Sequence, residues 1–123
     1  MVNRNQQLGE AGEAIAARYL QKKGYRILER NYRNNLGEID IIAKDRGVLV
    51  FVEVKSRTSG HWGHPKSSVT PAKQRKISMV ALAYLKSTGQ TRARARFDVV
   101  TVRAAAANPQ VDVITNAFEL AYI

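Results

Sequence analysis

Two short apolar segments of this chain each contain charged side chains of types that can do chemistry together. Asp40 lies within the segment 37–42, and Glu53 and Lys55 lie within the segment 48–55. Side chains at i and i+2 of a strand project from the same side. Glu53 and Lys55 therefore face the same way, and pairing with the preceding strand can bring Asp40 beside them. Two carboxylates and an ammonium in one place can hold a divalent metal ion and stabilise a charged oxygen.

The same three residues also allow a structural interpretation. Asp40 interrupts an apolar strand, and a buried carboxylate is costly unless it is paired or bound to a metal. A salt bridge from Asp40 to Lys55 or to a nearby arginine would satisfy it. Glu53 and Lys55 could likewise form an ion pair at the end of their strand. The spacing alone leaves both interpretations open.

The elements that must position these residues follow from periodicity and turn signals. Lys23-Gly24 ends the first helix, and Thr70-Pro71 opens the second as an N-cap followed by proline. The expected elements are helix 6–22, strands 25–32, 38–43 and 48–55, a helix from Pro71 to just before Gly89, strand 97–102 and an edge strand 111–114. This order predicts an α/β fold with a central mixed sheet and a helix on each side.

Composition limits the class of protein. A chain of 123 residues is long enough for one hydrophobic core, and 45% of its residues are hydrophobic. It carries 20 Lys and Arg against 10 Asp and Glu, and every basic residue precedes Ala104. Such an excess suits a polyanionic partner, either nucleic acid or an anionic membrane surface, although a merely basic soluble protein would show it too.

Several classes are excluded or disfavoured by what the sequence lacks. There is no cysteine, so disulfide frameworks and cysteine-ligated metal sites are excluded. The first residues show no apolar segment typical of a secretory signal, and no apolar run is long enough to span a bilayer. We therefore expect a cytoplasmic protein that does not act on membranes.

Four motifs, read in order, resemble a known group of proteins. They are Gly9-Glu10 with Gly12-Glu13, Gly37-Glu38-Ile39-Asp40-Ile41-Ile42, Phe51-Val52-Glu53-Val54-Lys55-Ser56-Arg57, and Pro71 with Lys73-Gln74. Over about residues 6–103 the chain resembles the restriction-endonuclease-like, or PD-(D/E)xK, nucleases. More narrowly, it looks like the uncharacterised bacterial YraN-like family, which is similar in pattern to archaeal Holliday-junction resolvases. One departure is that Ile39, not proline, precedes Asp40.

The resemblance implies a role for each motif residue. Asp40 and Glu53 would bind Mg²⁺ or Mn²⁺, and Glu13 from the first helix would complete the metal shell. Lys55 would position or activate the attacking water and stabilise developing charge. Gln74 would match a glutamine found at this place in related nucleases. From the residues alone, Glu13 at the border of its helix's apolar stripe could equally be a solvated side chain, and Gln74 could merely cap its helix.

Basic residues after the third strand and in the second helix suggest a face for nucleic acid. The residues expected there are Arg57, Lys66, Lys73, Arg75 and Lys76, with Arg92, Arg94 and Arg96 as further candidates. In the loop after Lys55, Trp62 could stack on a base or pack internally. His61 and His64 suggest zinc, but two ligands on a loop without partner ligands disfavour such a site.

The expected organisation is a domain of residues 1–103, with residues 104–123 as an extension packed on the same domain. The expected function is a Mg²⁺-dependent endonuclease that hydrolyses phosphodiester bonds in DNA, with branched DNA among the candidate substrates. The alternative is a non-catalytic nucleic-acid-binding protein on the nuclease fold. A scaffold that meets an acidic protein partner or an anionic membrane ranks last. Because the resolvases act as dimers, a homodimer is a further expectation.

Overall fold

The computed structural model describes residues 4–57, 69–103 and 108–118, except for the side chains of residues 4–9 and 57. The predictions for Lys66, for the side chain of Arg57 and for the loop with His61, Trp62 and His64 therefore lie outside the described residues. The elements are α1 (Arg4–Lys22), β1 (Arg26–Asn34), β2 (Gly37–Asp45), β3 (Val48–Arg57), α2 (Pro71–Ser87), β4 (Ala95–Arg103) and β5 (Gln110–Phe118). The predicted order of elements is confirmed.

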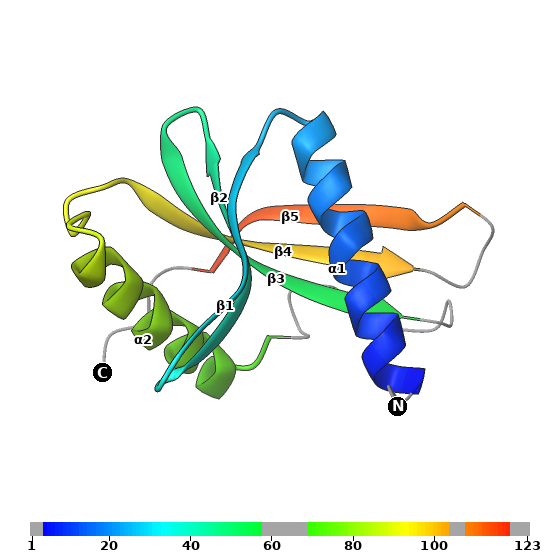
Figure 1. The fold of residues 1–123 in the computed structure, drawn as a ribbon, viewed down its shortest axis with the longest axis horizontal. Helices are drawn as coiled ribbons and strands as arrows, with labels where there is room; N and C mark the ends of the chain where they lie inside the picture. Colours follow the sequence, from blue (N-terminus) through cyan, green and yellow to red (C-terminus); the bar gives the residue numbers. More distant parts are fainter. Residues whose placement is uncertain (1–3, 58–68, 104–107, 119–123) are drawn as a thin grey trace.

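The strands form one mixed sheet in the order β1-β2-β3-β4-β5. Neighbouring strands are antiparallel except β3 and β4, which are parallel. A parallel pair needs a crossover connection, and α2 lies in the connection between these two strands (Figure 1). β5 pairs with β4 as an edge strand and runs beyond the expected range 111–114.

The two helices cover opposite faces of the sheet, as predicted (Figure 1). One core cluster contains Ile77, Val80 and Tyr84 of α2 together with Phe51 and other sheet residues. The second contains Ala16, Ala17 and Leu20 of α1 with alternate residues of the same central strands. Because both faces are covered, β3 and β4 consist largely of continuous apolar runs.

Asp98 is a charged group inside this core, in a strand predicted as nearly all apolar. The side chain of Asp98 on β4 is 0% exposed. It accepts hydrogen bonds from the Tyr25 hydroxyl at 2.9 Å, from the Arg96 guanidinium at 3.1 Å and from the backbone N–H of Asn116 at 2.9 Å. Arg96 also forms an ion pair with Asp45 at 2.9 Å. Arg96 is thus held in ion pairs within the protein, which contradicts its candidacy for the nucleic-acid face.

The start of α2 is fixed by the capping residues that the sequence predicts. Thr70 has extended backbone angles, and its side chain accepts a hydrogen bond from the backbone N–H of Lys73 at 3.2 Å. Pro71 occupies the first helical position, where its missing N–H costs nothing. This cap determines which residues of the first turn face the sheet.

Candidate functional site: carboxylates and lysines where β2 and β3 diverge

The site lies where the pairing between β2 and β3 ends. The two strands are paired from Asp45 with Val48 as far as Ile41 with Val52. Beyond that point a side chain replaces the backbone pairing. Asp40 Oδ2 accepts a hydrogen bond of 2.8 Å from the backbone N–H of Val54. Asp40 is thereby held between the two strands rather than on a regular ladder position.

The carboxyl group of Asp40 has a raised pKa, because it is buried and lies near two other carboxylates. The pKa of Asp40 is raised to about 7, first by burial and then by the charges of Glu53 and Glu13, against the opposing hydrogen bond from Val54. An acid whose pKa is raised by neighbouring acids gains most from a cation bound between them. The described residues therefore place Asp40 and Glu53 as a pair, as the sequence predicts.

Glu13 reaches this pair from α1, and Gly12 allows the approach. A methyl group on Gly12 would collide with the Ser56 hydroxyl, so only a glycine lets α1 lie this close to the end of β3. Burial raises the pKa of Glu13, and the charges of Glu38 and Glu10 add to this, while Arg30 and a hydrogen bond with Asp40 act in the opposite direction. Glu13 and Asp40 are therefore in direct contact.

Two lysines hold the second carboxylate of the pair. Lys55 Nζ lies 3.3 Å from Glu53 Oε1, and Lys73 Nζ lies 2.9 Å from the same oxygen. Burial lowers the pKa of Lys55, and its neighbour Lys73 lowers it further. Burial also acts to lower the pKa of Lys73, but hydrogen bonds with Lys55 and Glu53 outweigh it and the pKa is raised overall. The site thus holds one lysine from the sheet and one from α2.

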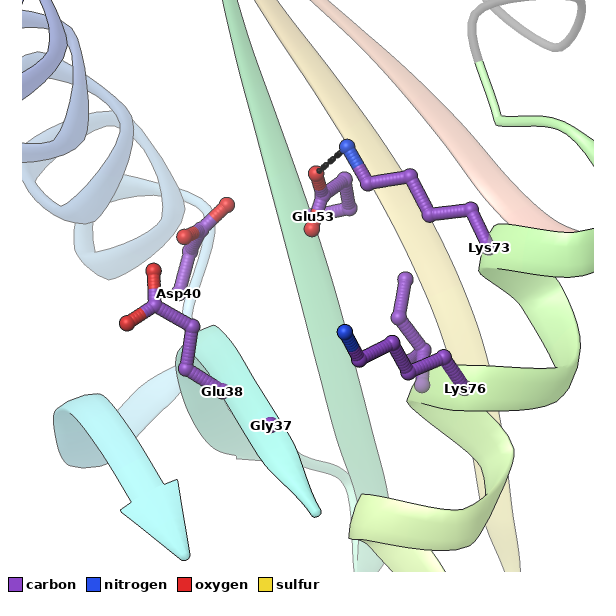
Figure 2. A pocket seen from close by; sticks show the side chains of 7 residues that line it. Gly37, Glu38, Asp40, Glu53, Lys73 and Lys76 are labelled. Carbon is purple, nitrogen blue, oxygen red and sulfur yellow. Dashed lines mark ion pairs between the residues drawn. The ribbon is translucent and has the colours of Figure 1, made fainter. Parts of the chain in front are cut away.

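Asp40, Glu53 and Lys73 line a cavity of about 250 Å³ between β2, β3 and α2. Figure 2 shows Lys73 and Lys76 extending from α2 toward the sheet, with Lys73 paired to Glu53, while Glu38 and Asp40 project from β2. Glu38 is exposed and forms an ion pair with Arg33 at 2.8 Å. One side of the cavity is therefore acidic, and the side formed by α2 is basic.

The structure places the predicted site residues unequally. Glu13, Asp40, Glu53 and Lys55 come together from α1, β2 and β3. The side-chain amide of Gln74 instead donates a hydrogen bond of 2.9 Å to the backbone carbonyl of Val69.

Among the residues expected to bind nucleic acid, Lys73 and Lys76 line the cavity, whereas Arg75 is exposed on the same helix. The ion pair between Lys73 and Glu53 was missed by sequence reasoning. The spacing in the sequence could have indicated this contact. Lys73 lies four residues before the buried Ile77, so the two residues share one face of the helix.

The donor set fits a hard cation with few protein ligands. Among the residues that the structure describes, no group of three or more Asp, Glu, His or Cys side chains is arranged to hold a metal ion. Asp40 and Glu53 offer a pair of mutually repelling carboxylates, and Mg²⁺ is commonly bound by one or two carboxylates while it keeps several waters. The place of Glu13 as a third ligand stays a prediction.

Fold and site together define an α/β protein with a five-stranded mixed sheet whose carboxylates and lysines meet where two strands diverge. The chain belongs to the uncharacterised protein family UPF0102, whose model matches residues 12–102.

Similar UPF0102 proteins include one from Geobacter metallireducens, 52% identical over 96% of this chain and 97% of the relative. Another, from Desulfosudis oleivorans, is 55% identical over 97% of this chain and 95% of the relative. The YraN-like resemblance is thereby confirmed.

A solved structure of SfsA from Pyrococcus furiosus in complex with Ca²⁺ matches with a TM-score of 0.40 and 15% identity. That match covers 90% of this chain and 62% of SfsA. Among the described residues of this protein, no helix is long and apolar enough to cross a membrane.

Proposed function

We propose that this protein is a metal-dependent nuclease that hydrolyses phosphodiester bonds in DNA. The observation that carries the proposal is the Asp40 carboxyl group held beside Glu53, with the Lys55 ammonium 3.3 Å from Glu53. Acid, acid and lysine on two adjacent strands form the constellation of the PD-(D/E)xK nucleases, which the sequence resembles. Membership of UPF0102 is compatible with this proposal and does not by itself assign an activity.

Asp40 and Glu53 would hold Mg²⁺ or Mn²⁺, and Glu13 would complete the ligand shell from α1. Such an ion, when bound, polarises a phosphoryl oxygen and lowers the pKa of a coordinated water. The hydrogen bond from Val54 keeps one oxygen of Asp40 fixed on the sheet. The two lysines on Glu53 Oε1 fix the second carboxylate in the same way.

In the proposed reaction, a water oxygen forms a bond to phosphorus, and one phosphorus–oxygen ester bond breaks. The bonding electron pair stays with the leaving oxygen, which takes a proton from solvent, while the attacking water loses a proton to solvent. The products are a phosphomonoester and a free hydroxyl. Lys55 would position the attacking water and stabilise the charge that grows on the phosphoryl oxygens.

The first turns of α2 would bind the DNA backbone. Lys73, Arg75 and Lys76 lie there, and the first turn carries no acidic residue, so the positive end of the helix dipole adds to their charge. Binding through phosphates should weaken steeply as salt is raised, with little sequence preference. Equal affinity in low and physiological salt would argue against this binding face.

The decisive experiment is cleavage of labelled duplex, single-stranded, flapped and branched DNA, and of matched RNA, with Mg²⁺ and with Mn²⁺. We expect cleavage by the wild type and its loss in Asp40→Asn prepared in the same way. Equal cleavage by both proteins would assign the activity to a contaminant. Binding without cleavage under every metal would reject the nuclease.

One observation favours a second candidate, a nucleic-acid-binding protein without catalysis. Glu53 Oε1 is paired with two ammonium groups, so the cluster is partly satisfied by its own side chains. Metal titration separates the two functions. A nuclease should gain thermal stability with Mg²⁺ or Mn²⁺ only when Asp40 and Glu53 are intact, whereas an internally satisfied ion cluster should show no such gain.

A further inference from the structure

Lys73 is the residue of α2 that forms an ion pair with Glu53. Its Nζ lies 2.9 Å from Glu53 Oε1, closer than Lys55 Nζ at 3.3 Å. Its side chain is 40% exposed against 18% for Lys55, and it lines the cavity. A phosphate that enters from solvent therefore meets Lys73 before Lys55.

Hydrogen bonds of the neighbouring Gln74 help to fix the position of Lys73. Its amide is bound to the carbonyl of Val69, and its backbone N–H to the carbonyl of Thr70. Together with the Thr70 cap on the N–H of Lys73, these bonds fix the start of α2. Gln74 thus stabilises the start of α2 through its hydrogen bonds. The side chain that faces Glu53 is that of Lys73.

Charge shows why a second lysine is useful. The carboxylates of Glu13, Asp40 and Glu53 and the two ammonium groups on Glu53 sum to one negative charge when all are ionised. Glu38 and Lys76, which also line the cavity, add charges that cancel. A divalent cation converts this to one positive charge, which matches a singly charged phosphodiester. Without Lys73 the same cluster would be neutral and would not favour the phosphate.

We propose that Lys73 is a catalytic residue, whose ammonium binds a non-bridging oxygen of the scissile phosphate and stabilises its charge as the bond to the leaving oxygen breaks. This inference rests on the proposed nuclease function. Lys73 moves no proton and forms no covalent bond, so water and phosphodiester still give a phosphomonoester and a hydroxyl. Lys55 remains on Glu53 when Lys73 turns to the phosphate.

The test replaces Lys73 by methionine, which keeps the length of the side chain and removes its charge. Lys55 still pairs with Glu53 in this variant, so no carboxylate loses its last cation. Single-turnover cleavage at saturating DNA should fall by ~10²–10³, the usual effect of removing one group that stabilises the transition state. Lys73→Arg should retain part of the rate. Lys86→Met, which removes the same charge from the last turn of α2, should cleave like the wild type.

A second readout separates contact with the phosphate from a structural role. Substrates carry sulfur in place of either non-bridging oxygen at the scissile phosphate. We expect that for one stereoisomer the rate losses from sulfur and from Lys73→Met are not additive, because both disturb the same contact. Mn²⁺ affinity without DNA should be equal to or tighter than that of the wild type, since a competing cation is gone.

Each result has a distinct meaning. A wild type that cleaves no substrate rejects the proposed function and this role together. An active wild type with Lys73→Met within twofold of its rate rejects the role of Lys73 alone. Additive losses for both stereoisomers reject the phosphate contact even if the variant is slow. Should Lys73→Met unfold, Lys73→Arg and its two sulfur substrates decide the same question.

Discussion

The Asp40 carboxylate accepts a hydrogen bond from the backbone N–H of Val54 at 2.8 Å, one residue beyond Glu53 on the neighbouring strand. This bond replaces a ladder bond at the point where β2 and β3 separate. It satisfies a backbone donor that the divergence would leave unpaired. The same contact holds Asp40 beside Glu53, so the break in the sheet and the carboxylate pair depend on each other.

Asp40→Asn should change how stability depends on pH. Because the pKa of Asp40 is raised to about 7 from an ordinary value near 4, the folded wild type binds the proton more tightly than the unfolded chain. The contribution of Asp40 to stability is then fully present below about pH 4 and is lost as the pH rises through 7. Asparagine can still accept the Val54 bond and carries no charge, so Asp40→Asn should lack this loss.

Denaturant unfolding with EDTA at pH values from 4 to 8 checks this prediction. The free energy of unfolding of Asp40→Asn, relative to the wild type, should increase across this range. Added Mg²⁺ at pH 8 should stabilise the wild type and leave the variant unchanged. Curves that stay parallel at every pH would show that the pKa of Asp40 is not raised in the folded protein.

Lys55→Ala should separate metal binding from cleavage. The substitution removes a cation that competes for Glu53, so Mn²⁺ affinity measured without DNA should be kept or improved. Cleavage should nevertheless fall by ~10²–10³, because the ammonium that stabilises developing charge is gone. Asp40→Asn is the contrasting variant, since it should lose both properties. A Lys55→Ala protein that cleaves at the wild-type rate would remove Lys55 from the mechanism.

Gly12→Ala tests the close approach of α1 to β3. Alanine inside a helix normally stabilises a protein by about 1 kcal/mol relative to glycine. Here the added methyl group meets the side chain of Ser56, so we expect destabilisation and slower cleavage, as α1 and Glu13 move away from Asp40. Ser56→Ala in the same background should recover part of both losses. If Gly12→Ala instead raised the free energy of unfolding by about 1 kcal/mol, α1 would not be in close contact with β3 at this position.

Asp98→Ala addresses the buried charge that lies outside the site. The substitution leaves Arg96, Tyr25 and the N–H of Asn116 without their shared acceptor, and breaking a buried ion pair in this way costs about 3–5 kcal/mol. Thermal and urea unfolding should show a large loss. The stabilisation by Mg²⁺ should persist in whatever fraction remains folded; its selective loss would connect Asp98 to the metal site.

Much of the fold was predictable because it rests on local patterns. The helix boundaries follow from Gly24 and from Thr70-Pro71, and the strands from apolar runs between turn residues. Some strand ends were predicted too short, because polar residues such as Asn34 and Gln110 still pair with a neighbouring strand, which composition does not show. The grouping of Asp40, Glu53 and Lys55 could be predicted from their spacing in the sequence, whereas the place of Glu13 could be predicted only from the family resemblance.

What sequence reasoning missed depends on contacts between distant parts of the chain. Asp98 lies in an apolar run, and its partner Tyr25 is 73 residues away, so its burial follows from sheet order and register. Lys73 and Gln74 are adjacent in sequence, and only the exact start of α2 decides which of them faces Glu53. The cap at Thr70 indicates where the helix starts. The direction of a side chain in the first turn also depends on how the helix lies on the sheet.

The parallel pairing of β3 with β4 has a consequence for how the protein folds. β1, β2 and β3 are joined by short turns and can pair early, whereas β4 must wait for the long crossover that contains α2 to close. We expect Asp40 and Glu53 to approach each other in this early hairpin unit, and Lys73 to join them late. Pulsed hydrogen exchange would detect the order, with Val54 protected before the first turns of α2. Newly made chains would then bring the acidic half of the site together before its basic half arrives.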